Sequence, residues 1–159
     1  MEGQTSDKQC SLSKTTIKNL EEMDFQCQRC SNCCRHDEGY VFLTKENAER
    51  IAAHLKMTLA EFMEQCCRKV EMPEGKVLCL KEKSNFDCIF WSNGCLIYEV
   101  RPTQCMTFPY WPFLVNDKKL QEEEKHRCKG LGVKGDHSLE YKIRMCELEQ
   151  NSEYYVVEK

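Results

Sequence analysis

The chain has 159 residues, 13 of which are cysteine, and a net charge of −3 with basic and acidic residues interspersed. This length excludes a large multidomain enzyme, yet it is sufficient for a hydrophobic core that does not depend on disulfides. The interspersed charge lacks the basic patch of a surface for nucleic acid or anionic lipid, so we expect no membrane partner and disfavour a nucleic-acid partner. The high cysteine content indicates that disulfides or metal ions help to organise the fold.

Two features favour metal over disulfides. Residues 1–8 contain no basic segment followed by an apolar run, so we expect no secretory signal and a cytoplasmic protein. The odd number of cysteines would leave at least one of them unpaired in an all-disulfide scheme. Thiols in a reducing compartment are expected to bind metal.

No transmembrane helix is expected. The longest uncharged stretch, Pro102–Asn116, is too short to span a bilayer comfortably and is interrupted by proline.

The first predicted elements are a short helix around Lys14–Met23 and a short strand over Gly39–Leu43. The strand is favoured because β-branched and aromatic residues cluster there. Thr44 suits the N-cap of a helix over Lys45–Leu55, in which apolar residues recur at helical spacing.

A second helix and a hairpin are predicted next. The helix begins at the capping box Thr58-Leu59-Ala60-Glu61 and extends to about Cys67. The hairpin joins the strand-like runs Lys69–Met72 and Lys76–Leu80 through the turn Pro73-Glu74-Gly75.

The remaining elements are short. Asn93-Gly94 predicts a tight turn within residues 87–98. Pro102 favours the start of a short helix over Thr103–Phe108, and Ser138 is expected to cap a last helix.

These elements predict an α+β fold: a small single domain of short strands and helices organised around a thiolate metal cluster. We expect a flexible N-terminal arm over residues 1–24 and a cysteine-cluster metal-binding domain over residues 25–150. A C-terminal tail over residues 151–159 would follow.

Four thiols lie within eight residues in the run Cys27-x2-Cys30-x2-Cys33-Cys34. A C-x2-C step lets two sulfurs converge on one tetrahedral ion and leaves the intervening amides free to bond the thiolates. Two overlapping steps also match the spacing that holds three corners of an iron–sulfur cluster. Neighbouring side chains diverge in strands and helices, so we expect Cys33 and Cys34 to serve different metals if both bind. His36, just after the run, is a further candidate ligand.

Four more cysteines lie near turn residues and complete a predicted set of eight metal ligands: Cys88, Cys95, Cys105 and Cys128. Eight thiolates suit two four-sulfur sites, although the spacing does not determine which thiols share a site. The glycines after Cys128 would let the backbone approach a bound ion. The other five cysteines are predicted not to bind metal, as an exposed thiol or as small apolar side chains: Cys10, Cys66, Cys67, Cys79 and Cys146.

Taken together, the ordered motifs resemble the CxxCxxCC (YkgJ-like) family of zinc- or iron-chelating proteins. The resemblance spans about residues 27–132 and includes the cysteine run, Asp87-Cys88-Ile89-Phe90, the stretch from Cys95 to Cys105, and Cys128-Lys129-Gly130. It implies an eight-cysteine protein that chelates zinc or iron. Flagellin lysine N-methylases carry a similar cysteine domain, which implies an iron–sulfur or methyl-transfer role as the alternative.

The resemblance also marks Tyr98 and Arg101, which lie three residues apart between two predicted ligands, as cofactor-binding candidates. We expect Arg101 to offset thiolate charge and the Tyr98 hydroxyl to donate a hydrogen bond to a sulfur. The alternative is that Arg101 pairs with a surface carboxylate such as Glu99 or Asp87.

Three functions therefore fit the sequence. One is a metal-binding protein whose closed thiolate sites are structural or sequester zinc or iron. Another is an iron–sulfur redox or methyl-transfer-related enzyme, because thiolates suit such clusters equally well. The third is a metal-stabilised module that binds a protein partner through the aromatic segment Phe108–Phe113, which would otherwise pack as a lid over the metal region.

Overall fold

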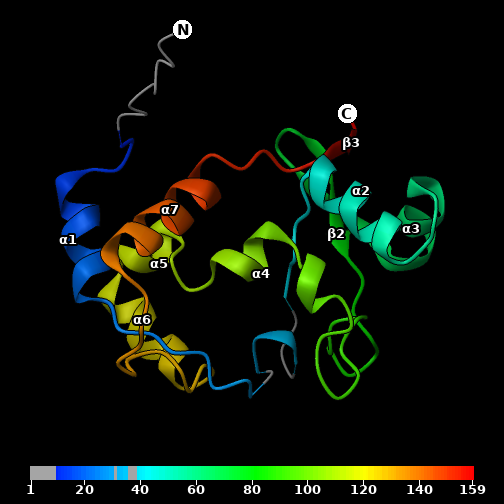
Figure 1. Ribbon diagram of the computed structural model, residues 1–159. Coiled ribbons are helices and arrows are strands. Elements are labelled where there is room, and N and C mark those ends of the chain that lie inside the picture. Colours follow the sequence, from blue (N-terminus) through cyan, green and yellow to red (C-terminus); the bar gives the residue numbers. More distant parts are fainter. Residues whose placement is uncertain (1–9, 31, 36–38) are drawn as a thin grey trace, which may run out of the picture.

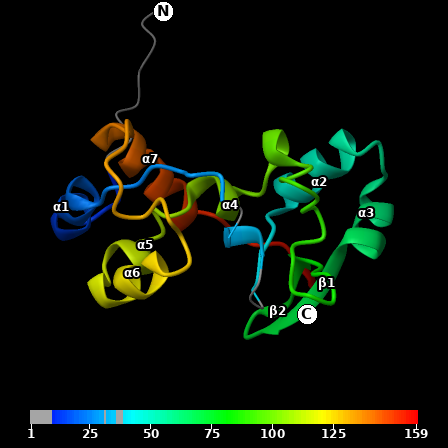
Figure 2. The same cartoon turned by 90° about the horizontal axis from the view of Figure 1, so that it is seen from below.

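The computed structural model describes residues 10–30, 32–35 and 39–159. His36 and residues 1–9 of the predicted arm therefore lie outside the described residues. Figure 1 shows two groups of elements on either side of the short helix α4 (Thr103–Thr107), and Figure 2 shows the same separation from a perpendicular direction.

One group consists of a three-stranded antiparallel sheet, in the order β1-β2-β3, and the helices α2 and α3. Its elements are α2 (Lys45–His54), α3 (Leu59–Cys66), β1 (Cys67–Met72), β2 (Gly75–Leu80) and β3 (Val156–Glu158). The predicted caps are confirmed, because the hydroxyls of Thr44 and Thr58 accept the N–H groups of Asn47 and Glu61. The predicted hairpin is also confirmed, with the register running from Cys67 opposite Leu80 to Met72 opposite Gly75.

The other group is helical (Figure 1). It contains α1 (Lys14–Glu22), α5 (Pro112–Val115), α6 (Lys118–Lys125) and α7 (Leu139–Gln150). Ser138 caps α7 as predicted, because its hydroxyl accepts the N–H of Tyr141 at 3.1 Å. Two 3₁₀ turns complete the fold, η1 (Asn32–Cys34) and η2 (Tyr98–Val100).

The predicted strand over Gly39–Leu43 is reduced to an isolated antiparallel bridge between Phe42 and Cys79. The backbone nevertheless follows β2, since the N–H of Leu43 donates to the carbonyl of Leu78 at 3.1 Å. Most of the hydrogen bonds of this segment are formed with residues outside β2. The N–H of Phe42, for example, donates to the side chain of Gln104 in α4.

Parts of both predicted termini pack against the domain. Leu20 in α1 is fully buried, and the buried side chain of Lys142 in α7 donates to the carbonyls of Leu20 and Met23. At the other end, β3 pairs with β2, with Val156 opposite Val77. The described parts of residues 1–24 and 151–159 therefore contribute to the fold, because each carries apolar side chains that the core or the sheet covers.

The buried apolar side chains of the described chain form two clusters. The sheet core is made by Leu43, Ala48, Ile51, Ala52, Phe62, Cys66, Cys67, Leu78, Leu80, Phe90 and Ile97. The helical core is made by Leu12, Leu20, Met23, Phe25, Tyr110, Leu114, Val115, Leu131, Met145 and Cys146. Cys88 and Cys95 pack against the sheet core, whereas Cys128 packs against the helical core. The predicted ligands thus lie on both sides of the junction between the two cores.

The fold is α+β, as predicted. Four of the cysteines expected to be small apolar side chains are buried, namely Cys66, Cys67, Cys79 and Cys146, and Cys10 is exposed as expected. In the part of the chain that the structure describes, no helix combines the length and the apolar character that crossing a membrane requires.

Candidate metal centre

The beginning of the cysteine run is paired with the segment that follows Cys128. Phe25 and Leu131 form an antiparallel bridge, and the N–H of Gln26 donates to the carbonyl of Gly130 at 3.0 Å. A Cβ atom on Gly130 would lie 2.2 Å from the Gln26 carbonyl oxygen, so only glycine allows this approach. The glycine thus admits the neighbouring segment, and the expectation that it also lets the backbone approach a bound ion stays a prediction.

The end of the run forms the 3₁₀ turn η1, in which the Sγ atoms of Cys33 and Cys34 are 3.8 Å apart. The expectation that these neighbouring side chains point apart is wrong. It considered only the Cβ directions, whereas rotation about χ1 brings the two sulfurs together. For metal–sulfur bonds of 2.3 Å, tetrahedral geometry places two ligand sulfurs about 3.8 Å apart. At this distance the two sulfurs can bind the same ion or two adjacent ions.

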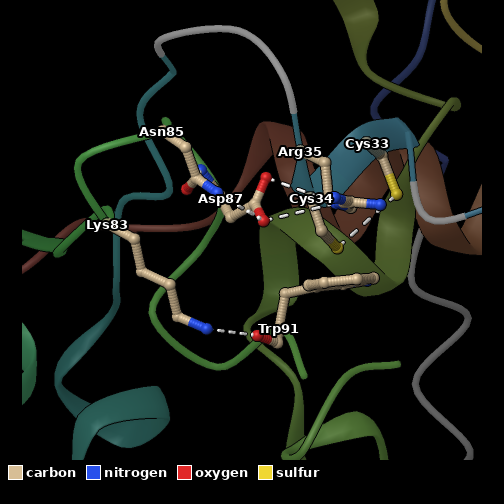
Figure 3. A network of polar contacts seen from close by, with 7 residues as sticks. All are labelled: Cys33, Cys34, Arg35, Lys83, Asn85, Asp87 and Trp91. Carbon is tan, nitrogen blue, oxygen red and sulfur yellow. Dashed lines mark hydrogen bonds and ion pairs between the residues drawn. The ribbon is translucent and has the colours of Figure 1, made fainter. Parts of the chain in front are cut away.

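The end of the run is also joined to the segment that carries Cys88. The N–H of Cys88 donates to the carbonyl of Cys34 at 2.7 Å. Next to this bond, Nε of Arg35 lies 3.3 Å from both carboxylate oxygens of Asp87, which is 3 % exposed. The Arg35 guanidinium also lies 3.7 Å from the ring centroid of Trp91, as Figure 3 shows. Together these contacts hold η1 against residues 87–91.

Asp87 is also held in place by Asn85, two residues before it in the chain. The side-chain amide of Asn85 donates to the Asp87 carboxylate at 3.2 Å, and the N–H of Asp87 donates to the Asn85 carbonyl oxygen at 3.1 Å (Figure 3). We did not predict the Arg35–Asp87–Trp91 contact. The only signal in the sequence is that an arginine directly follows the cysteine run and an aspartate directly precedes Cys88.

Cys95 and Cys105 approach the same region from two further elements. Cys95 forms an antiparallel bridge with Trp91 around the predicted turn, in which Asn93 and Gly94 have φ angles of 52° and 131°. Cys105 lies in α4, and its neighbour Gln104 donates to the carbonyl of Tyr40 at 2.7 Å. The helix that bears Cys105 is thereby attached to the chain that leaves η1.

Four predicted ligands have a backbone N–H two residues further along the chain that favours the thiolate. The N–H of Arg29 donates to the sulfur of Cys27 at 3.4 Å. The N–H groups of Phe90, Ile97 and Gly130 lower the pKa values of Cys88, Cys95 and Cys128. Such bonds preorganise a thiolate to bind a metal. They are not confined to the predicted ligands, because the buried Cys79 receives a backbone N–H from Val41.

Burial and mutual proximity oppose ionisation of these thiols in the metal-free chain. Burial raises the pKa of Cys88 to about 11 and also raises the pKa values of Cys95 and Cys128. Neighbouring thiols raise these pKa values further. A bound cation would reverse this balance, because thiolates are the form that coordinates metal.

Within the close pair, the hydrogen bond lowers the pKa of Cys33 and raises that of Cys34. The charges of Arg127 and Arg101 lower the pKa of Cys33 further. The 3₁₀ turn therefore carries one thiol that ionises more readily than an ordinary cysteine.

The charge of Arg101 acts on several thiols: it lowers the pKa of Cys33 and opposes the rise in the pKa values of Cys95 and Cys105. Its role as a cofactor-binding residue stays a prediction. Its guanidinium carbon lies 4.1 Å from the ring centroid of Tyr98, whose ring also lies 5.1 Å from the guanidinium of Arg29. In the described residues, Arg101 forms no ion pair with a carboxylate, and Asp87 pairs with Arg35 instead.

The role predicted for the Tyr98 hydroxyl is not supported by a contact. No hydrogen bond from this hydroxyl to a sulfur is found among the described residues, and the side chain is exposed. What the structure shows for Tyr98 is that its ring lies against Arg29 and Arg101.

The aromatic segment packs mainly on the helical core. Tyr110 is buried and its hydroxyl lies 2.8 Å from Nδ1 of His137, while Phe108 and Trp111 pack against the same core. Phe113 alone among these four aromatic side chains is largely exposed, at 63 %. Binding of a protein partner by this segment stays a prediction, centred on Phe113.

The structure thus brings the predicted ligand segments together, but it does not arrange a finished coordination sphere. Among the described residues, no group of three or more His, Cys, Asp or Glu side chains has metal-site geometry. The residues nevertheless fit a thiophilic ion in donor chemistry, in the 3.8 Å sulfur pair and in the N–H of Arg29 directed at the sulfur of Cys27.

Comparison with known proteins agrees with this chemistry. The model of the CxxCxxCC family, described as "Putative zinc- or iron-chelating domain", matches residues 26–130. No solved structure matches the chain. The match begins just before Cys27 and ends at Gly130, so it contains every candidate ligand described above.

Proposed function

The chain belongs to the CxxCxxCC family, and we propose that it is a metal-binding protein that holds zinc or iron through eight thiolates. The proposed ligands are Cys27, Cys30, Cys33, Cys34, Cys88, Cys95, Cys105 and Cys128. The observation that carries the proposal is the convergence of cysteine segments: the Sγ atoms of Cys33 and Cys34 are 3.8 Å apart, and the N–H of Cys88 donates to the carbonyl of Cys34 at 2.7 Å.

The position of the thiols supports a structural role for the metal. Cys88 and Cys95 contact the sheet core, and Cys128 contacts the helical core. An ion bound by thiolates from both sides would join two small cores, neither of which is large enough to be very stable alone. Bound metal would in this way supply part of the folding free energy.

The charges near the thiols support the same proposal. Four thiolates around one divalent ion leave a net charge of −2, which nearby guanidinium groups offset. Arg101 and Arg127 both act on Cys33 in this sense. The proposed role of Arg101 is therefore to balance the charge of the loaded site.

Anaerobic purification with metal analysis and an absorption spectrum tests the proposal. We expect zinc or iron to copurify with the wild-type chain. A colourless zinc protein would exclude the iron–sulfur alternative, and a brown protein with acid-labile sulfide would exclude a purely structural zinc site. A chain that takes up neither metal, before or after reconstitution, would refute the proposal.

The matched variants are Cys30→Ser and Cys10→Ser. Cys30 lies inside the run, whereas Cys10 is exposed and distant from it in the sequence. We expect Cys30→Ser to lose metal and to melt at a lower temperature, and Cys10→Ser to keep the metal content and melting temperature of the wild type. Equal behaviour of the two variants would show that the ligands are wrongly assigned.

A further inference from the structure

We propose that the eight thiols form two neighbouring four-thiolate sites: Cys27, Cys30, Cys33 and Cys128 in the first, and Cys34, Cys88, Cys95 and Cys105 in the second. This division rests on the proposed function, and it adds which thiols share an ion. It follows from the way in which the two ends of the cysteine run are held by different segments.

The first site is defined by the pairing of the run's beginning with residues 130–132. The N–H of Gln26 bonds to the Gly130 carbonyl, and the N–H of Gly132 bonds to the Asp24 carbonyl at 2.8 Å. Cys27 directly follows one of these segments and Cys128 shortly precedes the other. Cys30 and Cys33 follow Cys27 at C-x2-C spacing, which lets their sulfurs converge on the same ion.

The second site is defined by the contact of η1 with residues 87–91. The Cys88–Cys34 backbone bond and the Arg35–Asp87 ion pair lie next to each other, and the Trp91–Cys95 bridge brings Cys95 to the same place. Cys105 joins them from α4, because its neighbour Gln104 bonds to Tyr40 and Phe42 on the chain that leaves η1.

Cys33 lies at the boundary between the two sites, because it completes the C-x2-C step from Cys30 while its sulfur lies 3.8 Å from that of Cys34. The second site is complete with four ligands without it, whereas the first needs it as the fourth.

Anaerobic cobalt(II) and zinc(II) titrations, followed by native mass spectrometry and sulfur-to-cobalt charge-transfer absorption, test the division. We expect the wild type and Cys10→Ser to bind two ions per chain. Cys27→Ser/Cys128→Ser removes two ligands of the same site and should keep one ion. Cys95→Ser/Cys128→Ser removes one ligand from each site and should retain neither four-sulfur site.

A second variant covers the case in which serine substitution unfolds the chain. Cys128→His keeps a ligand, so we expect two bound cobalt ions, of which one has a four-sulfur spectrum and the other a three-sulfur, one-nitrogen spectrum. Changes in the spectra of both ions would overturn the division. A wild type that binds a single ion or one four-iron cluster would overturn it as well.

The result also separates the two proposals. A wild-type chain that binds no cobalt, zinc or iron would refute the proposed function. Binding to one site only, or the loss of both ions from Cys27→Ser/Cys128→Ser while that variant keeps its circular dichroism spectrum, would refute the division alone.

Discussion

At the scale of single residues, the cysteines of this chain differ in what surrounds each sulfur. Burial raises the pKa of Cys67 to about 12 and that of Cys146 to about 11, and no N–H from two residues further along the chain opposes it. At Cys88, the N–H of Phe90 opposes the effect of burial and lowers the pKa. Burial alone therefore does not identify a ligand, and neither does a backbone N–H alone, because the buried Cys79, which is not a predicted ligand, receives one from Val41.

The Arg35–Asp87 ion pair gives a prediction at this scale. We expect Asp87→Asn to weaken zinc binding about 10-fold or more, because the neutral amide no longer holds Arg35 and η1 in place. Competition with a chromophoric chelator measures the change. Neither Asp87 nor Arg35 is a proposed ligand, so the number of ions bound at saturation should not change.

The matched control is Glu158→Gln, which removes a carboxylate that is paired with Lys69 and Lys76 on the surface. Exposed ion pairs of this kind contribute about 0–1 kcal/mol to stability, and Glu158 lies in β3, far along the sequence from the cysteine segments. We expect no change in zinc affinity. If the two variants bind zinc equally well, Asp87 does not position the site.

At the scale of elements, the pairing of residues 24–26 with residues 130–132 depends on Gly130. A methyl group there would lie 2.2 Å from a backbone oxygen, so Gly130→Ala must separate the two segments. We expect a loss of about 1–3 kcal/mol in the free energy of unfolding of the metal-loaded chain, measured by urea denaturation. Lys129→Ala is the control, because Lys129 is exposed and its shortening disturbs no backbone contact.

Gly130→Ala should also weaken one site more than the other. Since the pairing positions Cys27 and Cys128, we expect one of the two cobalt ions to be released first during titration with a chelator. A stability equal to that of Lys129→Ala would show that the segments do not need this close approach.

The elements that the sequence predicted are those that local interactions determine. Thr44, Thr58 and Ser138 each accept an N–H three residues on, so the starts of α2, α3 and α7 could be predicted from a few letters. The pairing of Phe25 with Leu131, by contrast, joins residues that are far apart in the chain. Nothing in the composition of either segment specifies its partner.

The candidate site likewise has some features that the sequence predicts and others that it does not. The eight thiols could be selected as candidates from their spacing and neighbouring turns, and their role as ligands stays a prediction. The convergence of Cys33 and Cys34 could not be predicted, because it depends on a side-chain rotation. The contact of Arg35 with Asp87 could not be predicted either, because it spans 52 residues.

At the scale of the whole molecule, the two hydrophobic cores and the thiols between them explain why so small a chain contains so many cysteines. The sheet core has its own hydrogen-bonded ladder, from Cys67 opposite Leu80 to Met72 opposite Gly75. The cysteine segments contain 3₁₀ turns and isolated bridges instead. Such segments have few backbone bonds of their own and gain most from a bound ion.

Removal of the metal should therefore destabilise some parts of the molecule more than others. After chelation we expect the amides of Gln26 and Cys88, which bond to Gly130 and Cys34, to exchange with deuterium much faster. The amides of the β1–β2 ladder should remain more protected. Hydrogen exchange with mass spectrometry measures both, and a uniform loss of protection across the chain would show that the metal does not act at the junction.

The most direct test of metal binding by thiolates is X-ray absorption fine structure of the zinc- or iron-loaded wild type. We predict a first shell made of sulfur at about 2.3 Å, with four sulfurs per metal ion. This result is expected for either metal, because every proposed ligand is a cysteine. A first shell of nitrogen and oxygen at about 2.0–2.2 Å would contradict the account.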